Sequence, residues 1–224
     1  MVQRSRRGLV VAVVVQALFG LVEASAGPNE DSKLVVHLQA PAKTPCSQAG
    51  AAPACNGIVT AGDLYPPSTY YAYVLVTDAD TLLGVAGAQF GVAYAPSSEA
   101  GVDVFGWTSC ASLQFPEETW PENGSGNRIT WSPETQCQRS EPGGPGTGVV
   151  VTVGFFYCAA YSADTLRVTV WPNDSAATVA ACDAKEETVE SPTVQHSPSH
   201  LGFAVFSSGG TVPGHNPCGQ GGGN

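Results

Sequence analysis

Proline and glycine interrupt every stretch of this chain in which a helical repeat could run, and no other feature constrains the fold as strongly. The 224 residues include 26 glycines and 17 prolines. The apolar runs between them are short and rich in valine, phenylalanine and tyrosine, which is typical of strands that end at turns. The sequence therefore predicts an all-β fold, an antiparallel β-sandwich with Greek-key connections.

The expected strands number about nine, with boundaries soft by a few residues. Segment 69–77 is apolar on both faces, which indicates a central strand covered on both sides. In segment 165–172, Leu166, Val168 and Val170 alternate with polar residues and should face the core. Segment 184–200 is polar and charged and is expected to be a loop. The predicted strands are 34–39, 69–77, 84–94, 102–107, 110–115, 127–131, 149–161, 165–172 and 201–208.

Residues 1–26 have the pattern of a signal peptide. Three arginines precede an apolar run at 8–22, and Ala24-Ser25-Ala26 offers small residues where a signal peptidase cuts. The length of the apolar run favours the general secretory route over the twin-arginine route that "SRRGL" suggests. We expect a secreted, periplasmic or cell-surface protein, with 27–208 as one domain, 209–224 as a glycine-rich tail, and no transmembrane segment after signal removal.

The mature chain is acidic. Signal removal takes three of the nine basic residues and one of the nineteen acidic ones, which leaves 6 and 18 and a formal charge of −12. Such a surface repels phosphate backbones, so nucleic acid is a poor partner.

Seven cysteines remain, and in an oxidising compartment most of them should pair. Their spacing does not settle which cysteines pair, and the sequence has no C-x-x-C pattern of a zinc site.

Several short motifs resemble a group of exported bacterial proteins of uncharacterised activity. These are "GVAGAQFGVAY", "FGWTSC", "LQFPEETWP", "GSGNRITW", "GFFY", "VAAC" and "HNPC", in that order between residues 75 and 218. The resemblance implies a secreted β-sandwich, loosely similar to cohesin-like and immunoglobulin-like modules, and it brings no catalytic residues.

Cys158 follows "GFFY", where the resembled group has no cysteine, so the resemblance implies that Cys158 is the free thiol. A buried thiol in an apolar strand behaves as a small hydrophobe, which agrees. The other six then pair most simply in chain order, as Cys46–Cys55, Cys110–Cys137 and Cys182–Cys218. The last of these bonds would tie the tail to the domain.

Trp120 is the candidate for ligand binding. It lies in "EETWPEN" beside Glu122 and Asn123, whose polar groups could bind sugar hydroxyls while the indole stacks on a sugar ring. The competing interpretation, which we favour, is that the tryptophan and its prolines form a packed turn.

Asp78 and Asp80 end a strand and could bind calcium with Asp63 or Asp103, although a solvated turn also explains them. His196 and His200 are four residues apart, but Pro198 between them argues against a helical zinc motif.

The acidic residues of segment 117–134 would supply a glycosidase pair, but nothing indicates a cleft, and no G-x-S-x-G motif occurs. We therefore expect a module without catalytic activity or cofactor, with a structural, adhesive or binding role. Its partner is a polysaccharide or an envelope protein. The alternatives are a carbohydrate-binding module that uses Trp120, and a secreted hydrolase. The sequence leaves the partner, the anchoring and the oligomeric state open.

Overall fold

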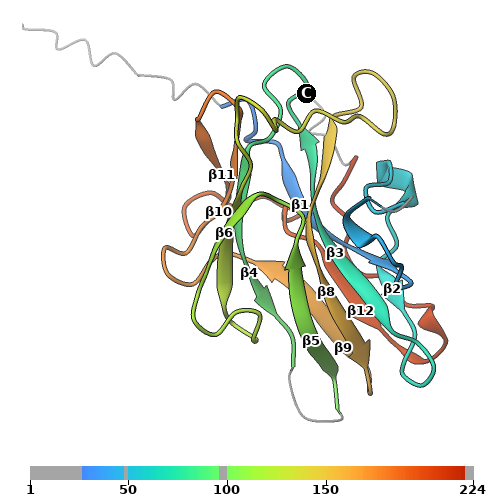
Figure 1. Ribbon diagram of the computed structural model, residues 1–224. Coiled ribbons are helices and arrows are strands. Elements are labelled where there is room, and N and C mark those ends of the chain that lie inside the picture. The colour runs from blue at the N-terminus through green and yellow to red at the C-terminus, as the bar shows by residue number, and fades with distance from the viewer. Residues whose placement is uncertain (1–26, 48–49, 96–99, 220–224) are drawn as a thin grey trace, which may run out of the picture.

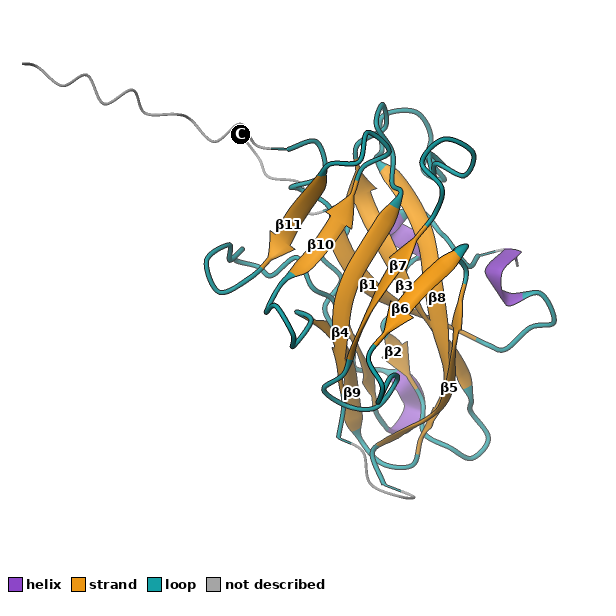
Figure 2. Cartoon of the chain, turned by 60° about the vertical axis from the view of Figure 1, so that its left-hand side comes forward, coloured by secondary structure: helices purple, strands orange, loops and turns teal. Residues whose placement is uncertain are grey.

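The computed structural model describes residues 27–47, 50–95 and 100–219, so the predicted signal peptide lies outside the described residues. Two β-sheets face one another and form a sandwich (Figure 1). The four-stranded sheet has the order β1-β3-β8-β5, and the larger sheet has the order β11-β10-β4-β9-β12-β2. Strands β7 and β6 lie beside β4 (Figure 2). All strand pairs are antiparallel except β12 with β2, so the predicted all-β sandwich is confirmed.

The strands are β1 (Lys33–Gln39), β2 (Ala61–Gly62), β3 (Tyr70–Ala79), β4 (Gly87–Ala93), β5 (Val102–Ser109), β6 (Leu113–Pro116), β7 (Gly126–Thr130), β8 (Val149–Ala160), β9 (Asp164–Thr169), β10 (Ala177–Ala180), β11 (Glu186–Glu190) and β12 (Phe203–Phe206). Three short 3₁₀ turns complete the described residues: η1 (Pro45–Ser47), η2 (Cys55–Gly57) and η3 (Ser208–Gly210). No helix of the described residues is long and apolar enough to cross a membrane.

The core lies between the two sheets and follows the alternation of the strands. On β9, Leu166 and Val168 are buried while Arg167 is exposed, as the sequence predicts. Phe90 of β4 and Phe156 of β8 fill the middle of the same core from opposite sheets. Burying a side chain of this size contributes roughly 1.5–3 kcal/mol, so burial in this core favours the packing of the two sheets.

The outer face of the four-stranded sheet is covered along part of its length by the 40–58 loop. Val74 of β3 belongs to the core between the sheets, whereas Tyr73 and Leu75 pack beneath this loop with Ala51. The Tyr73 hydroxyl donates to the carbonyl of Pro45 at 3.0 Å. The prediction that this strand is covered on both sides is therefore confirmed.

Two predicted segments differ from the structure. Segment 184–200 is not all loop, because it contains β11, which pairs with β10 as a hairpin. This strand was not predicted because its sequence is rich in glutamate. It is an outer strand of the sheet, and Val189 is its buried residue. The strand predicted at 110–115 begins only at Leu113.

The three disulfides join Cys46 to Cys110, Cys55 to Cys218, and Cys137 to Cys182, with Cα–Cα distances of 5.4, 5.2 and 5.8 Å. The pairing predicted in chain order is wrong in all three cases. Cys158 is the free cysteine, fully buried in β8.

The disulfides follow contacts between distant loops rather than chain order. The loop that carries Cys46 crosses the sheet to the end of β5, where Cys110 lies. Cys137 and Cys182 both lie beside the β3–β4 turn, since the sulfur of Cys137 and the amide of Cys182 both contact the carbonyl of Leu83.

Candidate functional site

Trp120 packs between the sheets. Its ring lies 5.7 Å from Phe90, 5.2 Å from Trp107 and 5.4 Å from Phe156, measured between ring centroids. These rings come from both sheets, so Trp120 closes one end of the core as a partly buried wedge. Its indole Nε1 is buried and has no hydrogen-bond partner among the described residues. The geometry favours packing over a ligand platform.

The two polar residues that flank Trp120 are exposed, and they also have structural partners. The side-chain oxygen of Asn123 accepts the amide of Tyr94 at 3.0 Å. The carbonyl of Glu122 accepts the Ser125 hydroxyl at 2.6 Å. The first bond fastens the 117–125 loop to the chain just after β4, and the second stabilises a turn within the loop.

The carboxylates considered for hydrolysis do not form an acid–base pair around a cleft. Glu117 accepts the indole N–H of Trp171 and the amide of Gly126, the latter at 2.9 Å, so its carboxylate supports the loop. Glu134 accepts the Ser132 hydroxyl at 3.1 Å on the surface.

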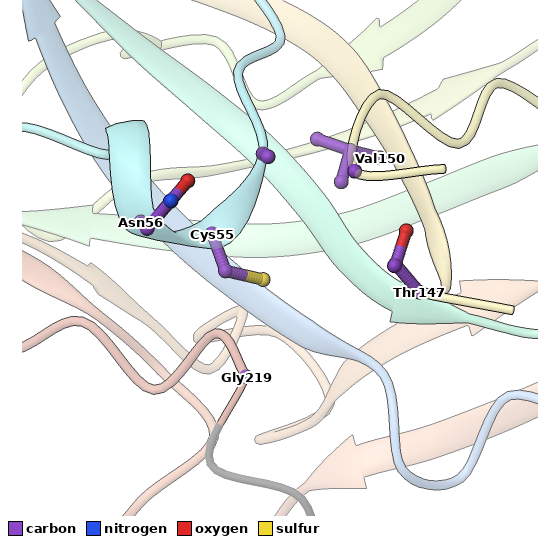
Figure 3. Close-up of a pocket in the computed structure, with 7 residues that line it drawn as sticks. Cys55, Asn56, Thr147, Val150 and Gly219 are labelled. Carbon is purple, nitrogen blue, oxygen red and sulfur yellow. The ribbon is translucent and has the colours of Figure 1, made fainter. Parts of the chain in front are cut away.

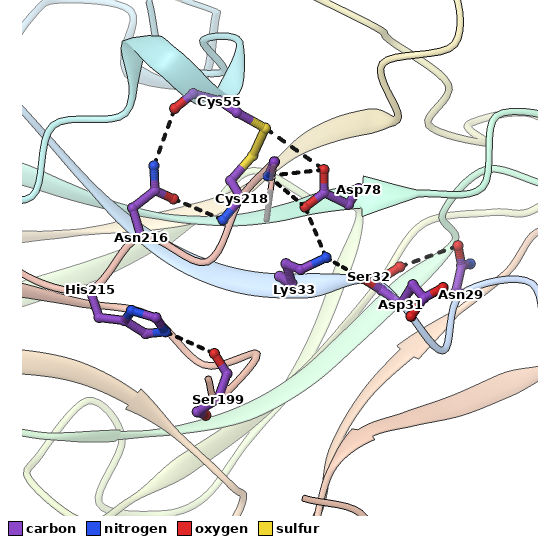
Figure 4. Close-up of polar contacts among 11 residues, drawn as sticks. Asn29, Asp31, Ser32, Lys33, Cys55, Asp78, Ser199, His215, Asn216 and Cys218 are labelled. Carbon is purple, nitrogen blue, oxygen red and sulfur yellow. Dashed lines mark hydrogen bonds and ion pairs between the residues drawn. A yellow bond between two sulfur atoms is a disulfide. The ribbon is translucent and has the colours of Figure 1, made fainter. Parts of the chain in front are cut away.

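Asp78 and Asp80 serve different partners. Asp78 forms an ion pair with Lys33 at 3.2 Å, and the amide of Gly219 donates to both of its carboxylate oxygens (Figure 4). The Lys33 side chain is only 3% exposed, whereas the Asp78 side chain keeps 18% of its surface in contact with water. Asp80 instead caps the β3–β4 turn by accepting the amides of Leu82 and Leu83.

Asp78 also lies next to a disulfide. The sulfurs of Cys55 and Cys218 and a carboxylate oxygen of Asp78 all lie within 4.8 Å of one another. Cysteine binds metal ions as a thiolate, and these two sulfurs are bonded to each other as a disulfide. The remaining ligand is the Asp78 carboxylate, which is already paired with Lys33.

A pocket of about 340 Å³ opens beside this disulfide (Figure 3). Its walls come from η2, the 143–147 turn, β8 and Gly219. Thr147 and Asn56 supply its polar side chains, and no acid or base lines it. A second pocket, of about 360 Å³, lies around Cys110 and Trp131 and also has no charged lining. Neither pocket has the groups that proton transfer requires.

The histidines of "HSPSH" stack on each other. The rings of His196 and His200 are 3.5 Å apart and nearly parallel. Burial, with a smaller effect of His196, lowers the pKa of His200 to about 4. The Nε2 of His196 and the Nδ1 of His200 are buried and lack partners within the described part of the chain. Stacked rings direct their nitrogens side by side rather than toward one centre, which does not suit a shared metal ion.

Three aromatic side chains that the sequence analysis did not single out form a surface on the four-stranded sheet. We call Tyr71 of β3, Tyr157 of β8 and Phe105 of β5 the aromatic surface. Phe105 is 51% exposed and Tyr157 is 39% exposed. The ring centroids are 5.2 Å apart between Phe105 and Tyr157 and 5.8 Å apart between Tyr157 and Tyr71.

The aromatic surface continues into the covered part of the same sheet face. The ring centroids of Tyr71 and Phe155 are 4.3 Å apart, and the Phe155 ring also packs against Tyr73 beneath the 40–58 loop. The loop therefore covers one end of an aromatic row and leaves the other end open. The sequence signal for this surface is the aromatic residues at alternate positions, Tyr71 and Tyr73 in β3 and Phe155 and Tyr157 in β8. The sequence alone does not show which of these rings the loop covers.

No protein-family model matches this sequence, and neither does any curated protein. Among solved structures, the chain is similar to a cohesin module of a family 33 glycoside hydrolase from Clostridium perfringens ATCC13124. The TM-score is 0.42 at 12% identity, over 79% of this chain and 98% of that one. It is also similar to the seventh ScaB type I cohesin from Pseudobacteroides cellulosolvens, at TM-score 0.42 and 8% identity, over 81% and 95% of the two chains. Both of these structures are cohesin modules, and the motif resemblance implies a β-sandwich loosely similar to such modules.

Proposed function

We propose that this protein is a non-catalytic binding module, secreted or held at the cell surface, that docks a protein partner on its aromatic surface. The observation that carries the proposal is a group of three neighbouring aromatic rings on an otherwise acidic molecule, of which Phe105 and Tyr157 are exposed and Tyr71 is half-buried. Tyrosine and phenylalanine are enriched at the centres of protein interfaces because they bury large areas at low entropic cost.

The tilt of these rings favours a protein partner over a polysaccharide. The planes of Phe105 and Tyr157 meet at 56°, and those of Tyr157 and Tyr71 meet at 75°. A sugar chain that stacks on several rings needs them nearly coplanar. Tilted rings leave apolar notches between them, which suit inserted side chains.

The rest of the molecule supports a role without catalysis. Asp78, Asp80, Glu117 and Asn123 each hold a loop or strand end in place. The burial that raises the pKa of Cys158 to about 12 keeps this thiol protonated, which makes it a poor nucleophile. Three disulfides in one domain are typical of proteins that fold outside the cytoplasm, which supports the proposed location.

Site-specific photo-crosslinking in the producing cells tests the docking surface. p-Benzoylphenylalanine replaces Phe105 in one variant and Tyr157 in a second. A control variant carries it at Leu82, which is 78% exposed on the β3–β4 turn. We expect the same polypeptide to be crosslinked from positions 105 and 157, at a yield that falls when Tyr71→Ala is added. Equal crosslinking from position 82, or no adduct from either test position, would contradict the proposal.

The sugar site at Trp120, Glu122 and Asn123 stays a prediction, as does calcium at Asp78 and Asp80. Titration of the intrinsic tryptophan fluorescence with soluble polysaccharides tests the first. A blue shift with one glycan that Trp120→Phe abolishes would support sugar binding there.

A further inference from the structure

A groove of about 310 Å³ lies on the larger sheet, where β9 extends past the start of β12. Its polar lining consists of Arg167, Thr169, Ser199 and His215. The apolar part of the lining includes Leu201, and a volume of this size accommodates one or two sugar rings.

The charge of this groove is opposite to that of the molecule. Its lining contains a guanidinium and an imidazole and no carboxylate, although the mature chain has three acids for every base. Among the described residues, the side chain of Arg167 forms no ion pair and no hydrogen bond, and its contact is with the Phe203 ring. By contrast, Lys33, Arg128 and Lys185 are each paired with a carboxylate.

The Arg167 side chain is held in place by an aromatic ring. Arg167 and Phe203 are paired across β9 and β12, and the guanidinium lies 5.2 Å from the centre of the Phe203 ring. A guanidinium that stacks through its face keeps all its N–H groups free in its own plane. Because the N–H groups of the Arg167 side chain form no hydrogen bond within the described residues, they are free to donate two parallel hydrogen bonds to one carboxylate.

His215 adds a hydrogen-bond acceptor to the groove. Its ring lies 5.8 Å from Phe203, and its Nε2 contacts the carbonyl of Ser199 at 2.8 Å (Figure 4). Because a carbonyl only accepts, Nε2 must carry the proton, and Nδ1 of the neutral ring is left as an acceptor. The hydroxyl of Thr169 can act as either donor or acceptor.

We propose that this groove binds a uronic acid unit of an acidic polysaccharide, with its carboxylate on Arg167 and its hydroxyls on His215 and Thr169. One cation surrounded by hydroxyl-binding groups matches a ligand with one carboxylate and several hydroxyls. A run of acidic peptide side chains matches less well, because glutamate and aspartate side chains bring no hydroxyls for His215 and Thr169 to bind. The groove lies on the sheet opposite to the aromatic surface, so this proposal and the proposed function stand independently.

Isothermal titration of the mature protein with trigalacturonate tests the proposal, with the fully methyl-esterified trisaccharide as the uncharged comparison. Arg167→Gln removes the guanidinium group while keeping most of the aliphatic part of the side chain. Arg139→Gln is the matched control, since Arg139 is also exposed and lies at a different surface beside Leu82. We expect Arg167→Gln to weaken trigalacturonate binding at least about tenfold, the usual loss for a charge-assisted bond, and Arg139→Gln to leave it unchanged.

Binding should also weaken as salt is added, because one ion pair contributes to it. The proposal is overturned if trigalacturonate does not bind, if its methyl ester binds equally well, or if the two arginine variants behave alike. Equal binding of tetraglutamate would also overturn it, because the groove would then recognise carboxylates without regard to the sugar.

Discussion

Replacing Trp120 separates its role in packing from a role in ligand binding. The ring is partly buried among Phe90, Trp107 and Phe156. Removing it deletes on the order of 100 Å² of buried apolar area, or roughly 2.5 kcal/mol at about 25 cal/mol/Å². The three lost aromatic pairs add about 0.5–1.5 kcal/mol each to this loss of stability. Removing the buried indole N–H, which has no partner within the described residues, reduces the loss by about 1–3 kcal/mol. Trp120→Ala should therefore lower the free energy of unfolding by about 3 kcal/mol, within the range measured for large core truncations.

Trp120→Phe is the informative companion. Phenylalanine keeps a ring in the same place and removes the buried N–H that has no acceptor, so we expect a change of less than about 1 kcal/mol. Urea unfolding followed by far-ultraviolet circular dichroism, with the disulfides intact, measures both variants. If Trp120→Ala leaves the free energy of unfolding within about 0.5 kcal/mol of the natural protein, the packing interpretation is refuted.

Three further predictions concern the cysteines and the histidine pair. Cys158 should resist iodoacetamide in the native protein at pH 8, because burial raises its pKa to about 12, and should react once per chain in guanidinium. Peptide mapping without reduction should recover the Cys55–Cys218 bond, and Cys55→Ser with Cys218→Ser should cost about 5 kcal/mol in the chain-entropy model, because the bond spans 163 residues. The folded pKa of His200 lies near 4, below its unfolded value of 6.5, so the stabilisation from its neutral form is present above pH 6.5 and is lost as the pH falls toward 4. Urea midpoints at pH 7 and pH 4.5 should therefore differ more for the natural protein than for His200→Asn.

The sheets were predictable because alternation and turn residues are local signals. The buried positions of β9 follow from the period of two, and the doubly covered β3 follows from its unbroken apolar run. β11 was missed because three of its five residues are glutamates on an outer strand, which gives it the same composition as a loop.

The disulfide pairing and the candidate sites were not predictable because they depend on which loops meet after folding. Cys46 and Cys55 are near in sequence, yet Cys46 bonds to Cys110 at the end of β5 and Cys55 bonds to Cys218 in the tail. Likewise, Arg167 and His215 are 48 positions apart, and only the pairing of β9 with β12, and of Phe203 with His215, brings them to one groove. The aromatic surface has a sequence signal, but its exposure depends on where the covering loop ends.

The disulfide pairing has a consequence for the response of the protein to proteolysis. The loop closed by Cys46–Cys110 overlaps the loop closed by Cys55–Cys218, so together they enclose every residue from Cys46 to Cys218. A single peptide bond cut anywhere between Cys46 and Cys218, including in the exposed 141–148 turn, leaves both fragments covalently joined. The exposed turns can therefore be nicked without separating the two sheets, and a nicked molecule should run as one band until it is reduced.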